Sequence, residues 1–343
     1  MSTQQNALLV GCGSIGKKHL EEILNAFDNV TVVDINEEAL KWAKDFGGER
    51  VSTATSLDAV LNAGFEPFAV ATVANWGPDH VPTIRALQAK GQKVFVVEKP
   101  LSDSIEDARN ILAEVERAGG KLFINLTRRF SGLPSGIENL AKQHNLGRIE
   151  GVTVTGGARC IATNGIHYLD LATVLFGSSP INVTADLASQ NINPRHESLS
   201  FYEGTVNYNY AGGERFSCVF LNGSAVTENV RFYWRNAEGE MAPNGDFVLR
   251  LRDEASIEQY PAVTRTGYAL NEVFRGNLWQ TETGLSGMAN LYQLVREGKT
   301  VSDTGSRTAE DLLAALHASE LGQRLSLPVD ATKIDITKHW SIS

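Results

Sequence analysis

The chain has 343 residues, more than one ordinary hydrophobic core accommodates, so its length predicts two domains. A net charge of −9, with lysines and arginines scattered along the chain, argues against nucleic acid as a partner. No apolar run reaches the roughly eighteen residues that span a membrane, and residues 1–6 lack the layout of a signal peptide. Three cysteines without paired spacing fit a reducing compartment and exclude a cysteine-built zinc site. We therefore expect a cytoplasmic protein with no membrane partner and no metal.

The first part of the chain alternates short apolar runs with helical patterns. Strands are predicted at residues 7–10, 30–34, 68–73, 94–97 and 122–126. Helices are predicted at residues 15–27, 37–46, 82–90 and 105–118. Repeated β–α units predict a doubly wound parallel sheet with right-handed crossovers, which is an α/β Rossmann domain over residues 1–127.

The pattern changes after residue 127, where strands follow one another. Helices are predicted at 135–144 and 165–176, a strand at 151–155, and several strands from 181 to 259, including 202–210, 216–221 and 230–234. Gly212-Gly213 is a hairpin signal between two of these strands. Two helices, at 281–297 and 308–321, close the chain. The pattern predicts an α+β domain over residues 128–343 with a large, mostly antiparallel open sheet.

A glycine-rich turn directly follows the first predicted strand and opens the first predicted helix. Residues 11–16 read Gly-Cys-Gly-Ser-Ile-Gly, which is the G-x-G-x-x-G pattern of a dinucleotide site. Asp34 ends the second strand, where a carboxylate accepts the ribose hydroxyls of NAD and repels the 2′-phosphate of NADP. A chance glycine cluster would not bring the strand, helix and acid with it. We predict that NAD, rather than NADP, contacts Gly11, Gly13, Ser14, Ile15, Gly16, Asp34 and Ile35.

Three further motifs resemble the Gfo/Idh/MocA family of oxidoreductases, the glucose–fructose oxidoreductase and inositol dehydrogenase group. They are Glu98-Lys99-Pro100, the segment from Asn125 to Phe130 (Asn-Leu-Thr-Arg-Arg-Phe), and the segment from Gly165 to Asp170 (Gly-Ile-His-Tyr-Leu-Asp). The resemblance implies a Rossmann domain followed by a domain whose open sheet covers the cofactor and often mediates oligomers. It also implies that the final helices pack back on the first domain. A homo-oligomer, a dimer or tetramer, is therefore expected.

Lys99 and His167 are the predicted catalytic residues. Glu98 and Lys99 end a parallel strand, and ligands bind at the carboxyl ends of such strands. An ammonium group there stabilises charge on a substrate oxygen, and Glu98 and Lys99 are also assigned to the cofactor. His167 lies in the first turn of a helix, whose positive end favours the neutral imidazole of a general base. The alternatives are a solvated Glu-Lys pair and a buried structural histidine.

The segment before His167 departs from the family pattern. The family commonly has Asp-x-Gly-x-His, but this chain has Thr163-Asn164-Gly165-Ile166-His167. Thr163 forms hydrogen bonds but does not ionise, so the proton relay differs or the usual reaction has been lost. Thr163 or Asn164 is alternatively the helix N-cap, and Asp170 either orients the His167 ring or is structural.

Further contacts are predicted around these residues. Thr72 near the end of the third predicted strand, and Ala74 and Asn75 in the loop after it, are assigned to the cofactor. One of Arg128 and Arg129 could bind a phosphate or carboxylate, with an interdomain salt bridge as the alternative. His80 is expected to be structural, and Trp279 and Gln280 are weak candidates. The predicted substrate contacts are Trp76, Asn125, Arg129, Asn164, His167 and Tyr168.

The leading hypothesis is an NAD-dependent dehydrogenase acting on a CH–OH group of a sugar, cyclitol or nucleotide sugar. The Gly-Cys-Gly-Ser-Ile-Gly-Lys-Lys-His start resembles family members of surface-polysaccharide and activated-sugar biosynthesis. Two alternatives stay open. One is a non-catalytic NAD-binding regulatory protein on the same fold. The other is an NAD-dependent redox elimination of the kind that some glycosidases perform.

Overall fold

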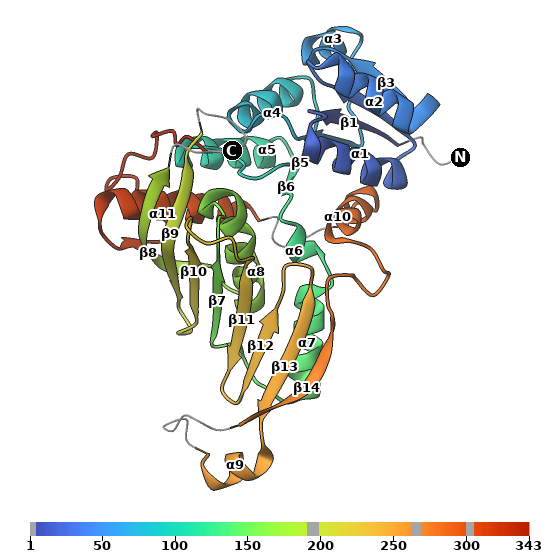
Figure 1. The fold of residues 1–343 in the computed structure, drawn as a ribbon. Helices are drawn as coiled ribbons and strands as arrows, with labels where there is room; N and C mark the ends of the chain where they lie inside the picture. Colours follow the sequence, from blue (N-terminus) through green and yellow to red (C-terminus); the bar gives the residue numbers. More distant parts are fainter. Residues whose placement is uncertain (1–4, 191–198, 262–268, 300–304, 343) are drawn as a thin grey trace. The chain divides into compact units, whose positions relative to one another are not determined.

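The computed structural model describes residues 5–190, 199–261, 269–299 and 305–342. The chain forms two compact units (Figure 1). Unit 1 comprises Met1–Thr127, Met288–Glu310 and Asp335–Ser343, and unit 2 comprises Arg128–Gly287 and Asp311–Ile334. Each unit is therefore built from segments that lie far apart in the sequence.

Unit 1 contains a parallel sheet of six strands in the order β3-β2-β1-β4-β5-β6. This order and the parallel pairing confirm the predicted doubly wound Rossmann sheet. The central strands β1, β4 and β5 are largely apolar because helices cover both faces of the sheet. They are β1 (Asn6–Val10), β2 (Asn29–Val33), β3 (Val51–Ala54), β4 (Val70–Val73), β5 (Val94–Val97) and β6 (Lys121–Ile124).

The helices of unit 1 bury one apolar stripe each against this sheet. In α1 the stripe includes Leu20 and Ile23, which are fully buried. Ser104 caps α5 by accepting a hydrogen bond from the amide of Asp107 at 3.2 Å. The helices are α1 (Ser14–Ala26), α2 (Glu37–Gly47), α3 (Leu57–Asn62), α4 (His80–Ala89), α5 (Ile105–Arg117) and α10 (Gly287–Arg296), with short 3₁₀ turns at Gly48–Arg50 and Gly77–Asp79.

Two features of unit 1 and its return segment were not predicted. Strand β3 and helix α3 were missed because β3 lies at the edge of the sheet and buries only Val51 fully, so it carries no clear apolar signal. The helix predicted at 281–297 begins only at Gly287. Residues 281–285 instead form a turn, in which Gly284 has a φ of +77° and donates its amide hydrogen to the carbonyl of Thr281.

Unit 2 contains a sheet of nine strands in the order β14-β13-β12-β11-β7-β10-β9-β8-β15, antiparallel except for the β7–β10 pair. This confirms the predicted mostly antiparallel sheet, and Gly212-Gly213 does form the β9–β10 hairpin. The strands are β7 (Gly151–Gly156), β8 (Pro180–Gln190), β9 (Phe201–Tyr210), β10 (Arg215–Phe220), β11 (Asn229–Trp234), β12 (Ala237–Met241), β13 (Asp246–Arg252), β14 (Leu270–Asn277) and β15 (Leu325–Ser326).

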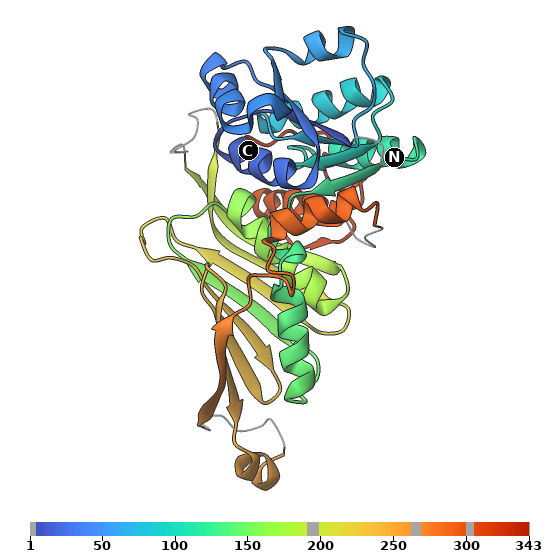
Figure 2. The same ribbon diagram turned by 90° about the vertical axis from the view of Figure 1, so that its right-hand side faces the viewer.

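One face of this sheet forms the core of unit 2. The strands alternate, so that Val152 and Val154 of β7 and Phe216 and Cys218 of β10 are buried. Helices α7 and α8 lie along that face (Figure 2). The helices in this part of the chain are α6 (Thr127–Phe130), α7 (Leu133–Gln143), α8 (Ile166–Phe176), α9 (Glu254–Gln259) and α11 (Ser306–Leu321), with a π-helical turn at Ile161–Gly165 before α8.

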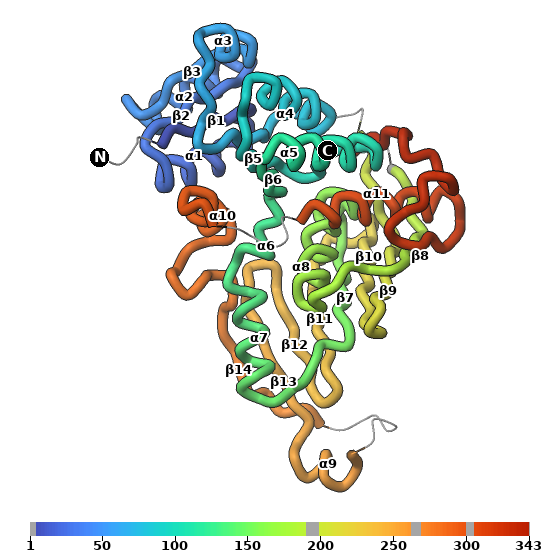
Figure 3. Tube along the Cα trace, turned by 180° about the vertical axis from the view of Figure 1, so that it is seen from behind, coloured from blue at the N-terminus to red at the C-terminus, as the bar shows by residue number. Residues whose placement is uncertain are grey.

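The segment after β14 returns beside α7 and packs directly on glycines (Figure 3). A Cβ on Gly132 would lie 1.8 Å from the carbonyl oxygen of Gln280. A Cβ on Gly245 would lie 2.5 Å from the Cβ of Trp279. The amide of Gly132 also donates to the carbonyl of Trp279 at 3.2 Å. Two glycines therefore permit the close docking of residues 279 and 280.

This docking predicts that Gly132→Ala lowers the stability of unit 2. The backbone of Gly132 has a φ of −69°, which alanine adopts freely, so the cost comes from the clash with Gln280 alone. We expect a loss of about 1–3 kcal/mol in the free energy of unfolding, measured with urea. Gly223→Ala is the matched control, because a Cβ there meets no atom within 4 Å. Equal stabilities of the two variants would contradict this account of the segment.

Candidate active site

The glycine turn between β1 and α1 is shaped by close backbone contacts. Gly11 has a φ of +93°, and a Cβ on it would lie 2.5 Å from backbone atoms of Ala74 and Asn75. A Cβ on Gly16 would lie 2.1 Å from the carbonyl oxygen of Gly11. Gly11 and Gly16 are therefore required by the fold itself, as the first and third glycines of the motif predict.

Gly13 differs from these two, because its surroundings are open. It is exposed, and a Cβ on it would meet no atom within 4 Å. Ser14 and Ile15, which begin α1, are also exposed, and no side chain caps this helix. The first amide groups of α1 thus face outward beside a position without a side chain, and such a helix start binds phosphate. These residues fit the pyrophosphate of a dinucleotide.

Asp34 lies at the end of β2, next to the glycine turn. Its carboxylate accepts hydrogen bonds from the amide of Cys12 at 2.5 Å and from the amide of Asn36 at 2.8 Å. Burial and the nearby Asp34 raise the pKa of the Cys12 thiol to about 11, so this thiol stays protonated at neutral pH. The next residue, Ile35, is 91% exposed, which leaves an apolar side chain beside the acid. Asp34 and Ile35 thus lie at the end of the second strand, the position at which Rossmann domains bind the ribose and base of a dinucleotide.

A buried carboxylate, Glu98, follows β5 at the carboxyl edge of the sheet. Its Oε1 accepts hydrogen bonds from His19 Nε2 at 2.9 Å and from Asn125 Nδ2 at 2.6 Å. Its Oε2 accepts from the amide of Lys99 at 3.2 Å. Burial by itself raises the pKa of Glu98, but the hydrogen bond from His19 and the charge of Lys99 outweigh it and hold the pKa below its usual range. Glu98 is therefore ionised inside the protein.

The hydrogen-bond network continues from His19 to a distant part of the chain. His19 Nδ1 lies 2.6 Å from the hydroxyl of Tyr292, which in turn lies 2.9 Å from Thr72 Oγ1. All five side chains of this network (Thr72, Tyr292, His19, Glu98 and Asn125) are buried in unit 1. Because the Glu98 carboxylate accepts from Nε2, that nitrogen carries the proton.

His19 and Tyr292 were not predicted as site residues. His19 follows Gly16 by three positions on the buried face of α1, and only a preference for burying histidine near a carboxylate could have drawn attention to it. Tyr292 lies on α10, about two hundred residues beyond β5, and no local signal links the two.

Asn125 offers one further atom at this edge. Its amide nitrogen is committed to the Glu98 carboxylate, which fixes the orientation of the amide. Its oxygen Oδ1 is buried, and no hydrogen-bond partner for it occurs among the described residues. Buried acceptors are almost always satisfied, so this oxygen fits a donor on a bound ligand. The Oδ1 of Asn75, after β4, is in the same situation.

The other predicted residues of unit 1 are found beside this network. Lys99 is half-buried and follows Glu98 directly. Ala74 is buried against the glycine turn, and Trp76 is 37% exposed at the start of a 3₁₀ turn. His80 is buried between the carbonyl oxygens of Pro100, at 2.9 Å, and Asn75, at 3.2 Å, and burial lowers its pKa. His80 therefore supports the loops, as expected from the sequence.

In unit 2 a π-helical turn leads into α8, and His167 is the second residue of that helix. His167 is half-buried, as are Thr163 and Asn164. The Thr163 hydroxyl donates to Asn164 Oδ1 at 3.2 Å. No side chain caps α8, so neither residue is its N-cap. Thr163 stands where the family pattern has an acid, and its hydroxyl is engaged with its neighbour.

Two predicted substrate contacts have internal partners in unit 2. Arg129 forms hydrogen bonds with both carboxylate oxygens of Asp170, and its side chain is 4% exposed. Tyr168 is fully buried, and its hydroxyl donates to Glu228 at 3.1 Å. This burial favours supporting roles for Arg129 and Tyr168 over substrate contact. Asp170 forms an ion pair with Arg129, which favours a structural role for this acid over orienting the His167 ring.

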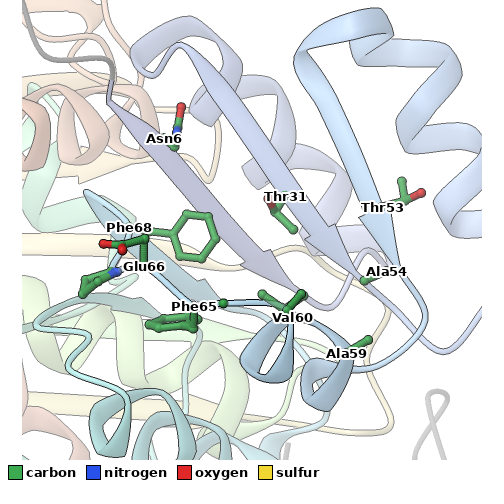
Figure 4. A pocket seen from close by; sticks show the side chains of 12 residues that line it. Asn6, Thr31, Thr53, Ala54, Ala59, Val60, Phe65, Glu66 and Phe68 are labelled. Carbon is green, nitrogen blue, oxygen red and sulfur yellow. The ribbon is translucent and has the colours of Figure 1, made fainter.

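A hollow of about 430 Å³ lies elsewhere in unit 1, between α3 and the strands (Figure 4). Val60, Phe65 and Phe68 line it, together with Asn6 from the start of β1. None of its lining residues belongs to the predicted cofactor or substrate site. Within the described ranges no cluster of acids, histidines and cysteines could hold a metal ion, and no helix is long and apolar enough to cross a membrane.

Comparison with known proteins relates the glycine turn and Glu98 to one family. Residues 5–126 match the GFO_IDH_MocA model, described as "Oxidoreductase family, NAD-binding Rossmann fold". An inositol 2-dehydrogenase of Burkholderia cenocepacia is 32% identical over 124 residues, which are 34% of this chain and 35% of that protein. The alignment thus spans about a third of the length of that relative. The match confirms NAD as the cofactor of this domain.

Solved structures extend the likeness to the whole fold. A levoglucosan dehydrogenase in complex with NADH and levoglucosan superposes with a TM-score of 0.72 at 14% identity, covering 95% of this chain and all of that one (100%). The WlbA dehydrogenase of Bordetella pertussis, in complex with NADH and UDP-GlcNAcA, gives 0.69 at 19% identity, covering 96% and 99%. At these identities the likeness concerns the fold alone.

The open position at Gly13 predicts that Gly13→Ala weakens NAD binding without unfolding the protein. The added methyl group meets no protein atom but stands where the backbone receives the pyrophosphate. We expect at least about a tenfold higher Kd for NAD in titration calorimetry, with an unchanged melting temperature. Gly16→Ala, by contrast, should lower the melting temperature, because its Cβ would clash with the carbonyl of Gly11. Unchanged NAD affinity in Gly13→Ala would exclude this phosphate position.

The ionised Glu98 predicts a pH-dependent effect of Glu98→Gln. The pKa of Glu98 is lower in the folded state than the roughly 4.3 of an unfolded chain, so its stabilisation is complete above about pH 5 and is lost as the pH falls. At pH 7 we expect Glu98→Gln to cost about 2–4 kcal/mol in urea unfolding, because hydrogen bonds from His19 and the Lys99 amide lose their charged acceptor.

Between pH 7 and pH 3.5 the difference between wild type and Glu98→Gln should shrink by about 1 kcal/mol. Glu116→Gln, at an exposed position of α5, is the control and should show a small difference at both pH values. A gap for Glu98→Gln that stays constant with pH would mean that Glu98 is not ionised in the folded protein.

Proposed function

We propose that this chain is an NAD-dependent dehydrogenase of the Gfo/Idh/MocA oxidoreductase family, whose NAD-binding Rossmann model matches its N-terminal domain. The match confirms the predicted family for residues 5–126. The proposed substrate is a sugar, cyclitol or nucleotide sugar with a CH–OH group that is oxidised to a carbonyl or formed from one. A relative named inositol 2-dehydrogenase and neighbours bound to levoglucosan or UDP-GlcNAcA support a polyhydroxylated substrate.

The buried Glu98 carboxylate at the carboxyl end of β5 gives this function its main support. It holds the Lys99 amide and the Asn125 side chain at the edge where ligands of open α/β sheets bind. Burying a charge costs desolvation free energy, so an ionised buried carboxylate adds little to the stability of a fold. Here the charge fixes the neighbours that a reacting ligand would meet.

The proposed chemistry divides between two residues. NAD, when bound, supplies the acceptor for the hydride that leaves the substrate carbon. In oxidation, His167 accepts the hydroxyl proton from its position in the first turn of α8. Lys99 donates a hydrogen bond to the same oxygen and stabilises the negative charge that develops on it.

Thr163 favours a second candidate, a non-catalytic NAD-binding protein. The family commonly has an acid at this position, and the Thr163 hydroxyl is engaged with Asn164 at 3.2 Å. Such a protein would bind NAD with no turnover of any substrate. Turnover therefore separates the two candidates, and NAD binding does not.

The proposal includes two broader expectations. The chain is proposed to act in the cytoplasm, and it is proposed to assemble as a homodimer or homotetramer. Light scattering on the purified protein tests the second, and a monomer at micromolar concentration would remove it from the proposal.

The assigned roles predict the effects of Lys99→Met and His167→Gln. With a panel of sugars, cyclitols and nucleotide sugars, NADH absorbance should reveal at least one substrate of the wild type. Each variant should lower kcat/KM for that substrate by about 10²–10⁴-fold while its Kd for NAD stays within a few-fold of wild type. His144→Gln and Lys93→Met are the matched controls and should retain activity.

Full activity of either Lys99→Met or His167→Gln would refute the role assigned to that residue. Absence of turnover by the wild type over the whole panel, with NAD bound, would favour the non-catalytic candidate instead.

A further inference from the structure

Two adjacent arginines of unit 2 have very different surroundings. The guanidinium of Arg129 is buried and pairs with both oxygens of Asp170, at 2.9 Å and 2.5 Å. Arg128, one residue earlier, forms no ion pair with any carboxylate in the part of the chain that the structure describes. The sequence had left open which of the two could bind an anion, and the salt bridge of Arg129 singles out Arg128.

The Arg128 guanidinium is held by aromatic rings. Its Cζ lies 4.1 Å from the centroid of the Tyr168 ring and 5.6 Å from that of Trp279. Its Nε is buried, and no hydrogen-bond partner for this atom occurs within the described ranges. Stacking on aromatic faces restrains the planar group, and the Tyr168 hydroxyl forms a hydrogen bond with it, but neither contact satisfies Nε. Arg128 is thus a restrained cation whose Nε donor is unsatisfied.

The acids around Arg128 are already engaged by other groups. Glu228 accepts from the Tyr168 hydroxyl at 3.1 Å and from Arg159 Nε at 3.0 Å. Asp170 is committed to Arg129. An arginine stays charged at any accessible pH, so the charge of Arg128 has no internal carboxylate to balance it. An external anion would supply both the opposite charge and an acceptor for Nε.

Tyr168 and Trp279, which together form the aromatic clamp on Arg128, are themselves held in place by the fold. Trp279 packs against Gly245, since a Cβ on Gly245 would lie 2.5 Å from the Cβ of Trp279. The carbonyl of Trp279 accepts a hydrogen bond from the amide of Gly132. Tyr168 is fixed by burial and by its hydrogen bond to Glu228. A guanidinium restrained in this way loses little freedom when it binds a carboxylate or phosphate through two parallel hydrogen bonds.

We propose that Arg128 binds an anionic group of the substrate, a carboxylate or a phosphate, and that the substrate is therefore an acidic sugar. Uronates, sugar phosphates and nucleotide sugars share this chemistry. The inference rests on the proposed function for the identity of the sugar as the reacting molecule. Its link to the reaction is Tyr168, which carries the Arg128 clamp and directly follows His167 in α8.

The test measures binding to the NAD-loaded protein by titration calorimetry. The probes are glucose as the neutral sugar, glucuronate for the carboxylate, glucose 1-phosphate for the phosphate, and UDP-glucose and UDP-glucuronate for the nucleotide sugars. The wild type should bind at least one anionic probe more tightly than glucose. The preferred probe identifies the source of the anion.

Arg128→Gln should weaken binding of the preferred anionic probe by about 10- to 100-fold, the range for hydrogen bonds to charged groups. Arg128→Lys keeps the charge but loses the paired donors, so an intermediate loss is expected. This variant also serves if the glutamine substitution prevents folding. Arg231→Gln, at an exposed position of β11, is the matched control and should bind as the wild type does.

Unchanged affinity for the preferred probe in both Arg128 variants would overturn the proposal. So would a wild type that binds none of the anionic probes more tightly than glucose. Arg128-dependent anion binding without NADH formation would uphold this subsite while the proposed dehydrogenase activity fails. Turnover of neutral polyols, unaffected by Arg128→Gln, would do the reverse.

Discussion

The buried charge of Glu98 is the constraint on which unit 1 depends. An ionised carboxylate inside a protein must be compensated by hydrogen bonds and nearby positive charge. Here His19 from α1, Asn125 after β6 and the amide of Lys99 supply the hydrogen bonds, and Tyr292 from α10 supports His19. One carboxylate therefore joins segments that lie far apart in the sequence, at the carboxyl edge of the sheet, which is where open α/β sheets generally bind ligands.

The same physical rule distinguishes the two units. In unit 1 the buried Glu98 carboxylate is satisfied, while the side-chain oxygens of Asn125 and Asn75, both acceptors, have no partner among the described residues. In unit 2 Asp170 and Glu228 pair with Arg129 and Arg159, while Arg128 Nε, a donor, is among the buried atoms for which the described residues supply no partner. The Asn125 oxygen is suited to a hydrogen-bond donor on a ligand, and Arg128 is suited to an anionic acceptor.

The sequence predicted those features that have a local cause. The structure contains the predicted glycine turn, the alternation of strands and helices, and the hairpin at Gly212-Gly213. Each depends on backbone conformation or hydrophobic periodicity within a short segment. The edge strand β3 was missed because it buries little, and the late start of α10 was missed because Gly284 stops the helix in a turn. The partnership of His19 with Tyr292, and the difference between Arg128 and Arg129, arise from contacts across hundreds or tens of residues, which no local pattern encodes.

We expect the carboxyl edge around Glu98 to receive the reacting end of NAD. A crystal structure of the protein soaked with NAD would show where each part of the cofactor binds. We expect the pyrophosphate on the amides that begin α1 and the nicotinamide beside Lys99, with a ligand donor within hydrogen-bond distance of Asn125 Oδ1. A nicotinamide bound away from Lys99 and Asn125, with the pyrophosphate still on α1, would contradict the account.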